Sequence, residues 1–438
     1  MKRVVVFGAG LVAPPLLRYL LDHGFDVTVA AADAERAAAL VAGRDRARAL
    51  ALDVDRTAAV ERLVAESDLA VSLLPAAKHP LVAQACIDRG RHLVTTSYVS
   101  PAMRALDAAA RARGVLLLNE MGVDPGIDHM SAMQLIDRER AAGAELVGFR
   151  SWCGGLPAPE VDAGPFGYKF SWSPRAVLTA ARNPARYLRA GRVVAVEPAE
   201  LFARPELVEV GAAGTFEGYP NRDAVAYLDG YGFDRQRVRD FFRGTLRNRG
   251  HCRLFAQLVA LGLIEPEPAH PCRGKSHRQL LAELLGGAPE QRIPQRLGVP
   301  AAQSPLAALE HIGLLSDAPI GRERISTLNW LAQRMSASLA YREGERDMLL
   351  MRHDLTFARP GGARRRTTAV MTVYGIPGGD SAMARTVSLP AAIAARLLLE
   401  GRIPGRGVRI PTDREIYAPV LAELAQLGIG FEETRAPA

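Results

Sequence analysis

The chain of 438 residues is too long for a single hydrophobic core, and its length predicts two or three domains. Its 48% hydrophobic and 23% charged residues are ordinary for a globular protein and argue against disorder and against a coiled coil. The net charge of +8 comes from arginines scattered among acidic residues, so no basic face for nucleic acid is indicated.

The start of the chain and its cysteines predict a protein of a reducing compartment. The apolar run Val4–Phe7 is too short for a signal peptide, and no stretch reaches the roughly 18 uninterrupted apolar residues of a membrane span. The four cysteines lack metal-ligand spacing and are expected to be free thiols. We therefore expect a cytoplasmic protein with no metal, no membrane partner and no nucleic-acid partner.

Residues 3 to about 120 alternate short β-branched runs with alanine-rich helical stretches such as Leu16–His23 and Ala34–Ala42. The expected strands are Arg3–Phe7, Asp26–Ala30, Arg48–Leu52, Leu69–Leu73, His92–Thr95 and Val115–Leu118. Strands separated by helices of this length indicate βαβ units and a doubly wound parallel sheet. Ligands of such a sheet bind beyond the carboxyl ends of its strands.

After Asn119 the pattern changes. The expected elements are a helix over Gly126–Asp137, β-like pieces from Val147, mainly helical chain over about 236–345, two strands in RDMLLMRHDLTF and RRTTAVMTVYG split by a turn at Pro360-Gly361-Gly362, then two helices from Asp380 and a short strand near Ile429–Phe431. We therefore expect an α/β protein with a Rossmann-type domain over 1–123. A mixed α/β substrate domain over 124–390 carries the helical insertion, and a C-terminal segment, 391–438, packs back on the first domain.

A glycine-rich turn follows the first strand and opens a helix. It comprises Gly8, Ala9, Gly10, Leu11, Val12 and Ala13. Gly8 permits a tight turn, Gly10 lets the backbone approach a pyrophosphate, and Ala13 permits close helix packing. This context indicates dinucleotide binding, and Asp33 stands roughly where an acidic residue bonds the adenosine ribose. Asp53 ends the third strand and is equally compatible with the adenine side and with a surface carboxylate.

Two polar segments follow later strands of this domain. The hydroxyls of Thr95–Pro101 are placed to face a ligand or to cap the next helix. Asp124 before Pro125 has the form of an N-cap with proline at the first helical position. Capping and catalysis can coexist at one residue.

The second domain offers groups suited to carboxylates. Cys153-Gly154-Gly155 is expected to expose backbone N–H groups, and Arg222 and Arg247 carry guanidinium forks, with Thr245 beside the latter. Each arginine taken singly is more typical of a surface or ion-pair residue, because exposed arginine is common.

Together these segments resemble saccharopine dehydrogenase of the L-glutamate-forming type. The resemblance covers nearly the whole chain and includes FGAGLVAPPLLRYL, VSLLPAAKHPLVAQACI, TTSYVSPAMRAL, NEMGVDPGIDHMSAM, CGGLPAPE, GYKFSWSPRAVL, GYPNRD, RGTLR and ERDMLLMRH. It implies oxidation of saccharopine at its secondary-amine carbon with hydride transfer to a nicotinamide. Water then cleaves the imine to L-glutamate and 2-aminoadipate 6-semialdehyde.

The resemblance also implies site residues. Substrate contacts match Ser97, Tyr98, Asp124, Cys153, Gly154, Arg222, Thr245, Leu246 and Arg247. Cofactor contacts match Gly8 to Ala13, Asp53, Leu73, Leu74, Pro75, Ser97, Val123, Asp124, Pro125 and Ser173. Asp124, Tyr98 and Cys153 are the candidates for proton transfer, and residue type does not rank them.

The cofactor and the partners are less sharply indicated. NADP-using fungal relatives have an arginine about where Ala32 stands, and Asp33 would repel a 2′-phosphate, so NAD is the expected cofactor. Arg36 keeps NADP open. The alternatives are a reductase for a carboxynorspermidine-type imine, which would have no use for three carboxylate sites, and a non-catalytic NAD(P)-sensing scaffold. The sequence does not indicate an oligomeric state, and a homodimer is considered only because symmetric dimers are the commonest oligomers.

Overall fold

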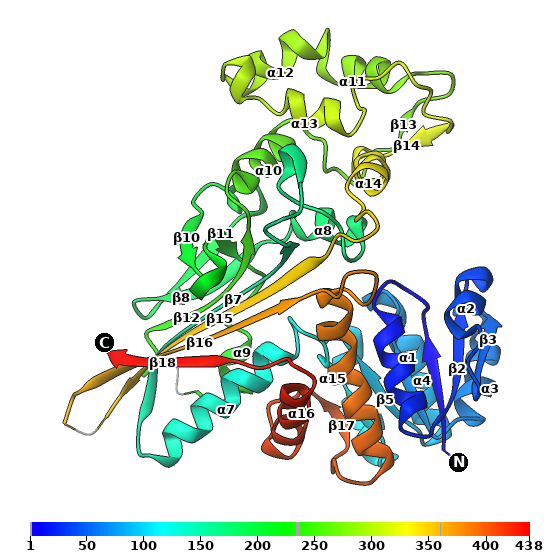
Figure 1. The fold of residues 1–438 in the computed structure, drawn as a ribbon, viewed down its shortest axis with the longest axis vertical. Coiled ribbons are helices and arrows are strands. Elements are labelled where there is room, and N and C mark those ends of the chain that lie inside the picture. Colours follow the sequence, from blue (N-terminus) through cyan, green and yellow to red (C-terminus); the bar gives the residue numbers. More distant parts are fainter. Residues whose placement is uncertain (1, 234–236, 360) are drawn as a thin grey trace. The chain divides into compact units, whose positions relative to one another are not determined.

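The computed structural model describes residues 2–233, 237–359 and 361–438, which form two compact units (Figure 1). Unit 1 contains residues 1–145, 359–361 and 379–432, and unit 2 contains residues 146–358, 362–378 and 433–438. The expected start of the helical insertion at 236 and Pro360 of the expected turn lie outside the described residues.

The described part of unit 1 is built on a seven-stranded parallel sheet. Its strands in spatial order are β17 (Gly407–Arg409), β6 (Leu116–Leu118), β5 (His92–Thr95), β4 (Leu69–Ser72), β1 (Arg3–Phe7), β2 (Asp26–Ala31) and β3 (Ala47–Ala51). Apart from β17 this is the Rossmann strand order. Successive strands are added on one side of β1 up to β3 and on its other side from β4 onward, so the strand order reverses between β1 and β4. The doubly wound prediction is confirmed, and the six predicted strands agree with the observed ones to within one residue at each end.

Helices cover this sheet. They are α1 (Ala13–Asp22), α2 (Ala34–Val41), α3 (Thr57–Ala65), α4 (His79–Arg89), α5 (Pro101–Arg104), α6 (Asp107–Ala112), α7 (Ile127–Ala141), α15 (Ala382–Leu399) and α16 (Arg414–Gln426). Helices α3 and α4 bury apolar side chains against Val5 and Phe7 of β1. Helix α15 packs on α1 and contacts β4 and β5 (Figure 1).

By length and composition, α15 is the one helix among the described residues that could cross a membrane. Of its 18-residue apolar window, 83% is buried inside the protein. That burial is typical of a core helix.

The limits of unit 1 differ from the expected domain limits at 123/124 and 390/391. Helix α7 packs on α16, and β17 pairs in parallel with β6, so both ends of the chain contribute to this unit. The first turns of α15 belong to it as well, because α15 packs on α1 along its length.

The described part of unit 2 contains a nine-stranded mixed sheet. Its main path is β10 (Glu206–Glu209), β11 (Thr215–Pro220), β12 (Asp240–Arg247), β7 (Glu145–Pro157), β15 (Asp347–Ala358), β16 (Arg364–Tyr374) and β18 (Glu432–Pro437), with β8 (Ala185–Arg189) and β9 (Arg192–Val196) beside β12. Strand β12 corrects the expectation that chain from 236 onward is mainly helical. Most of its residues are buried, so the sequence lacks the polar alternation of a half-exposed strand.

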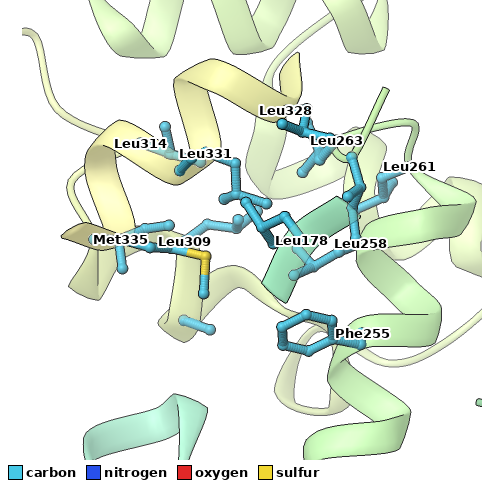
Figure 2. Packing of buried hydrophobic residues seen from close by; sticks show 14 of the residues in the cluster. Leu178, Phe255, Leu258, Leu261, Leu263, Leu309, Leu314, Leu328, Leu331 and Met335 are labelled. Atoms are coloured by element: carbon cyan, nitrogen blue, oxygen red, sulfur yellow. The ribbon is translucent and has the colours of Figure 1, made fainter. Parts of the chain in front are cut away.

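The helices of unit 2 are α8 (Pro174–Ala180), α9 (Tyr227–Gly230), α10 (His251–Ala260), α11 (His277–Leu285), α12 (Pro289–Leu297), α13 (Leu306–His311) and α14 (Thr327–Ser338). All of them except α9 contribute to a second hydrophobic core. Figure 2 shows Leu258 of α10, Leu309 of α13 and Leu331 of α14 packed around Leu178 of α8. This core holds α10 firmly, and α10 begins four residues after the end of β12.

Candidate functional site

In unit 1 the glycine turn lies between β1 and α1. The N–H of Gly8 donates to the Ala30 carbonyl at 2.8 Å. Gly8 has a φ of +112°, and a Cβ at this position would lie 3.2 Å from the Leu73 carbonyl oxygen. A Cβ on Gly10 would meet nothing within 4 Å. Helix α1 begins without a capping side chain. Open space at Gly10 beside an uncapped helix start suits a phosphate.

Asp33 follows β2 and Asp53 follows β3, the two strands on the side of β1 opposite to β4. The Asp33 carboxylate is the N-cap of α2 and accepts from the Arg36 N–H at 2.9 Å. The Asp53 carboxylate accepts from the Asp55 N–H at 3.0 Å. Both residues therefore have local structural roles.

Tyr98 and Asp124 are brought together from two segments of unit 1. The Tyr98 hydroxyl donates to Asp124 Oδ1 at 2.7 Å, and both residues are half-buried. A phenol bonded to a carboxylate is a pair that can hold or pass a proton.

Asp124 is not the N-cap of α7, so that expectation is wrong. The N-cap position is Gly126, whose N–H donates to Asp128 Oδ1 at 2.6 Å. Gly126 has a φ of +147°, and a Cβ there would lie 2.0 Å from the Gly122 oxygen, so only glycine fits. The tight turn makes Gly126 the N-cap, with its N–H bonded to Asp128, and places Asp124 outside the helix.

A buried carboxylate braces both segments. Glu120 is 2% exposed and adopts a φ of +60°, which is uncommon for a residue other than glycine. Its Oε1 accepts from the Val99 N–H at 2.9 Å, and its Oε2 lies 2.7 Å from His129 Nε2. Glu120 thus connects Val99, which follows Tyr98, to His129 of α7, which follows Asp124 in the chain. Strain of this kind is typical of functional sites.

Ser97 belongs to a second polar network in unit 1. Its hydroxyl lies 2.8 Å from Nε2 of His79, the first residue of α4. Thr95 Oγ1 lies 3.0 Å from the same nitrogen, and Ser72 Oγ lies 2.8 Å from Nδ1. The expected capping role in this segment falls to Ser100, whose hydroxyl accepts from the Met103 N–H at 3.1 Å.

In unit 2, strand register places three predicted residues on one face of the sheet. Thr245 of β12 pairs with Cys153 of β7 on one side and with Tyr219 of β11 on the other. Arg247 lies two residues after Thr245, so its side chain shares that face. Cys153 and Arg247 are each 7% exposed, while Thr245 is half-buried.

Gly154 and Leu246 differ from expectation. Residues 153–155 lie inside β7, between the neighbouring strands β12 and β15, and do not form a loop with exposed N–H groups. A Cβ on Gly154 would lie 2.6 Å from the Leu246 oxygen, so this glycine allows the strands to approach. The Leu246 side chain is fully buried in an apolar cluster with Trp152.

Arg247 has the environment of an anion-binding group. Its guanidinium carbon lies 5.0 Å from the centre of the Tyr168 ring, and Nη1 donates to the Leu246 carbonyl at 2.9 Å. Within the described part of the chain, Nε has no hydrogen-bond partner and no carboxylate forms an ion pair with this arginine. A buried guanidinium without a carboxylate is costly unless a ligand completes it.

The other predicted residues of unit 2 are exposed. Arg222 lies on the loop after β11 with a φ of +56°, and its carbonyl accepts from the Arg186 N–H at 2.9 Å. Ser173 is the N-cap of α8, accepting from the Ala176 N–H at 3.3 Å.

Sequence reasoning missed several buried polar residues near the predicted ones. They are His79, Glu120 and His129 in unit 1, and Tyr168 and His251 in unit 2. Four of them, all except His251, stand in the quoted motifs VSLLPAAKHPLVAQACI, NEMGVDPGIDHMSAM and GYKFSWSPRAVL. A signal that could have found them is a charged or imidazole side chain directly beside an apolar run at the end of an expected strand.

The fold and these residues define a protein with a Rossmann-type dinucleotide domain and a second mixed α/β unit. Two family models match it: the saccharopine dehydrogenase NADP binding domain over residues 4–118 and the saccharopine dehydrogenase C-terminal domain over residues 122–429. The chain belongs to the saccharopine dehydrogenase family.

Individual relatives agree. A Pyricularia oryzae protein named saccharopine dehydrogenase [NADP(+), L-glutamate-forming] is 38% identical over 97% of both chains. The apo structure of the L-glutamate-forming saccharopine dehydrogenase of Saccharomyces cerevisiae covers 100% of both chains at 34% identity, with a TM-score of 0.88. The mitochondrial alpha-aminoadipic semialdehyde synthase of Bos taurus is 36% identical over 98% of this chain. The chain spans 47% of that bovine protein's length.

Proposed function

We propose that this protein is a saccharopine dehydrogenase that oxidises saccharopine and releases L-glutamate and 2-aminoadipate 6-semialdehyde. A hydride leaves the secondary-amine carbon, the amine nitrogen loses a proton, and water adds across the resulting C=N bond before the C–N bond breaks. The single observation that carries the substrate class is the buried Arg247 guanidinium, which lacks a carboxylate partner among the described residues. Saccharopine has three carboxylates to offer.

The glycine turn of unit 1 fits a dinucleotide. Gly8 and Gly10 leave room for a pyrophosphate at the start of α1, and Leu73, Leu74 and Pro75 follow β4 at the same edge of the sheet. A bound nicotinamide would accept the hydride, so the protein has to orient the substrate and manage protons. Val123, Pro125 and Ser173 are proposed cofactor contacts on family resemblance alone.

Proton transfer is assigned to the hydrogen-bonded pair of Tyr98 and Asp124. The carboxylate accepts from the phenol at 2.7 Å, so Asp124 is the stronger candidate to accept a proton from the amine or from water. Cys153, with Thr245 and Arg247 on one sheet face, is the third candidate. It is 7% exposed, and its proposed role is contact with the substrate.

Carboxylate binding is assigned to Arg247, Arg222 and the hydroxyl of Thr245. Charge-assisted bonds from guanidinium groups are the strongest that a protein offers to a carboxylate. Gly154 and Leu246 contribute only main-chain groups, because Leu246 has its side chain in the core and Gly154 has none.

The cofactor is a nicotinamide dinucleotide, and NAD is proposed over NADP. The fungal relatives are named for NADP(+), which argues for the opposite preference. Here Asp33 stands just after β2, with its carboxylate held at the start of α2. A negative charge there repels a 2′-phosphate and accepts from a 2′-hydroxyl.

The rival functions have less support. A cationic polyamine-type imine suits Arg222 and Arg247 poorly, because charge complementarity governs such specificity. A non-catalytic sensor does not require the Tyr98–Asp124 pair. The names of the fungal relatives support the saccharopine dehydrogenase activity instead.

Steady-state assay of the purified protein tests the proposal. Saccharopine with NAD or NADP should yield reduced nicotinamide and glutamate in equal amounts. Turnover of a decarboxylated analogue without turnover of saccharopine would overturn the substrate class.

Two further expectations stay predictions. Homodimer formation is tested by light scattering on the eluting protein, and a cytoplasmic location by fractionation of the source cells.

A further inference from the structure

His79 lies at the centre of a buried hydroxyl network in unit 1. It is 1% exposed and hydrogen-bonds three side chains: Ser72 through Nδ1 at 2.8 Å, and Ser97 and Thr95 through Nε2 at 2.8 and 3.0 Å. Ser72 is the last residue of β4 and Thr95 the last residue of β5. The imidazole therefore joins the carboxyl ends of two neighbouring strands.

The third hydroxyl sets this histidine apart from a residue that merely fills the core. Ser72 and Thr95 are both 0% exposed and by themselves satisfy both ring nitrogens. Ser97 lies two residues beyond β5, is half-buried, and is held at a shorter distance than Thr95. In a doubly wound sheet this is the edge at which ligands bind.

We propose that His79 is a positioning residue: it fixes the Ser97 hydroxyl in the orientation in which Ser97 contacts the bound reactants. The inference rests on the proposed function, because it takes Ser97 as a ligand contact. His79 itself touches neither substrate nor cofactor and acts through Ser97.

The protonation state of the ring supports this role. Burial lowers the pKa of His79 to about 4, so the imidazole is neutral near pH 7 and has one N–H and one lone pair. The ring is 1% exposed, and its packing between the two strands holds Nε2 toward Ser97. The hydroxyl of Ser97 therefore loses its rotational freedom before a ligand arrives.

Two conservative substitutions of His79 distinguish the contribution of Nδ1 from that of Nε2. The asparagine amide of His79→Asn occupies the place of Nδ1 and keeps the bond to Ser72, whereas the longer amide of His79→Gln reaches the place of Nε2 and keeps the bond to Ser97. We expect kcat/KM for saccharopine to fall about tenfold in His79→Asn and to stay near wild type in His79→Gln. Equal losses in both variants would overturn the positioning role.

Melting temperature is the second readout of this pair. Each amide keeps one side of the network, so both variants should lose similar stability. Ser72→Ala is the matched control: it removes the Nδ1 contact and should lower the melting temperature with kcat/KM unchanged.

A double-mutant cycle with Ser97→Ala tests whether His79 acts through Ser97. If it does, His79→Asn has no further effect on kcat/KM in the Ser97→Ala background. Additive effects overturn the positioning role and leave the proposed function intact. Wild-type kinetics in Ser97→Ala instead overturn the ligand role of Ser97, on which the inference rests.

A measurement on folded protein covers the case in which His79→Asn does not fold. In nitrogen-15 spectra of the imidazole, Ser97→Ala should move the Nε2 resonance of His79 and leave Nδ1 nearly in place. An unmoved Nε2 resonance overturns the proposal.

Discussion

Both units bury histidines beside their candidate site residues, and two of these, His79 and His251, are held by different forces. His79 in unit 1 hydrogen-bonds three hydroxyls. His251 in unit 2 stacks on Phe255, with ring centres 4.1 Å apart, and within the described residues its Nδ1 has no hydrogen-bond partner. Burial lowers the pKa of both, and in His251 the positive charge of Arg247 lowers it further.

The contrast extends to the neighbouring charged groups. In unit 1 the Asp124 carboxylate and the buried Glu120 carboxylate both accept hydrogen bonds from the protein. In unit 2 Arg247 Nε lacks a partner among the described residues, as does Nδ1 of His251. The candidate groups of unit 1 are preorganised by their own bonds, and the unpartnered atoms of unit 2 support the proposal that an anionic ligand binds there.

The largest expected effect comes from removing the charge of the preorganised carboxylate. Asp124→Asn keeps an oxygen that accepts from Tyr98 and loses proton-accepting ability. We expect kcat to fall about 10²- to 10⁴-fold, the scale of a lost general base. The melting temperature should change little, because Asp124 does not cap α7.

Asp128→Ala is the matched control for stability. It removes the acceptor of the Gly126 N–H and should lower the free energy of unfolding by about 1 kcal/mol. An Asp124→Asn enzyme that melts early and turns over normally would show that Asp124 is structural.

Removal of the unpartnered guanidinium in unit 2 should affect binding and stability in opposite directions. Arg247→Met preserves much of the apolar stem and should lower kcat/KM for saccharopine about 10²-fold, with the cofactor Kd unchanged. Its stability should be equal to or greater than wild type, because a buried charge without a carboxylate is lost.

Arg222→Met is the comparison for an exposed arginine. We expect a similar loss in kcat/KM and no change in stability, since Arg222 is exposed. Weaker nicotinamide binding in either variant, or a markedly lower melting temperature in Arg247→Met, would contradict the assignment.

The same two regions show what sequence can predict. Six of the seven strands described in unit 1 were predicted to within one residue, because β-branched runs separated by helices leave few alternatives. Strand β12 was missed because its residues are buried on both faces, and β17 because Gly407 and Arg409 leave Val408 as its one apolar residue. Asp124 before Pro125 satisfied the local rule for a cap, but the N-cap is Gly126, which has a φ of +147°.

The sequence motifs identified most of the proposed site residues. They did not identify the residues that hydrogen-bond those site residues and fix their positions. His79 meets Ser97 across 18 positions of sequence, through the pairing of β4 with β5. The sequence around either residue does not predict this contact. In unit 2, CGGLPAPE suggested an open loop, whereas Gly154 serves the close approach of Leu246.

A smaller effect is expected for cofactor preference. Asp33→Asn retains an N-cap for α2, since Asn caps about as well as Asp, and removes the negative charge. We expect the ratio of kcat/KM for NAD to that for NADP to fall about tenfold, a moderate like-charge penalty at an exposed position. Asp33→Ala shows whether loss of the cap adds an effect. A native preference for NADP that neither variant changes would show that Asp33 points away from the ribose.

The smallest expected effect is the pH dependence of stability caused by His79. Its folded pKa of about 4 lies below the ordinary 6.5, so the unfolded chain binds the proton more tightly. This contribution is fully present above pH 6.5, declines as pH falls from about 6.5 to about 4, and is constant below that. Between pH 7.5 and pH 6 the loss should be about 1 kcal/mol. His79→Gln cannot titrate, so subtracting its unfolding free energies from those of the wild type, pH by pH, removes the contribution of the carboxylates. A flat difference curve would mean that the ring accepts a proton as readily in the fold as in water, and the assignment of His79 as a neutral imidazole that hydrogen-bonds three hydroxyls would be wrong.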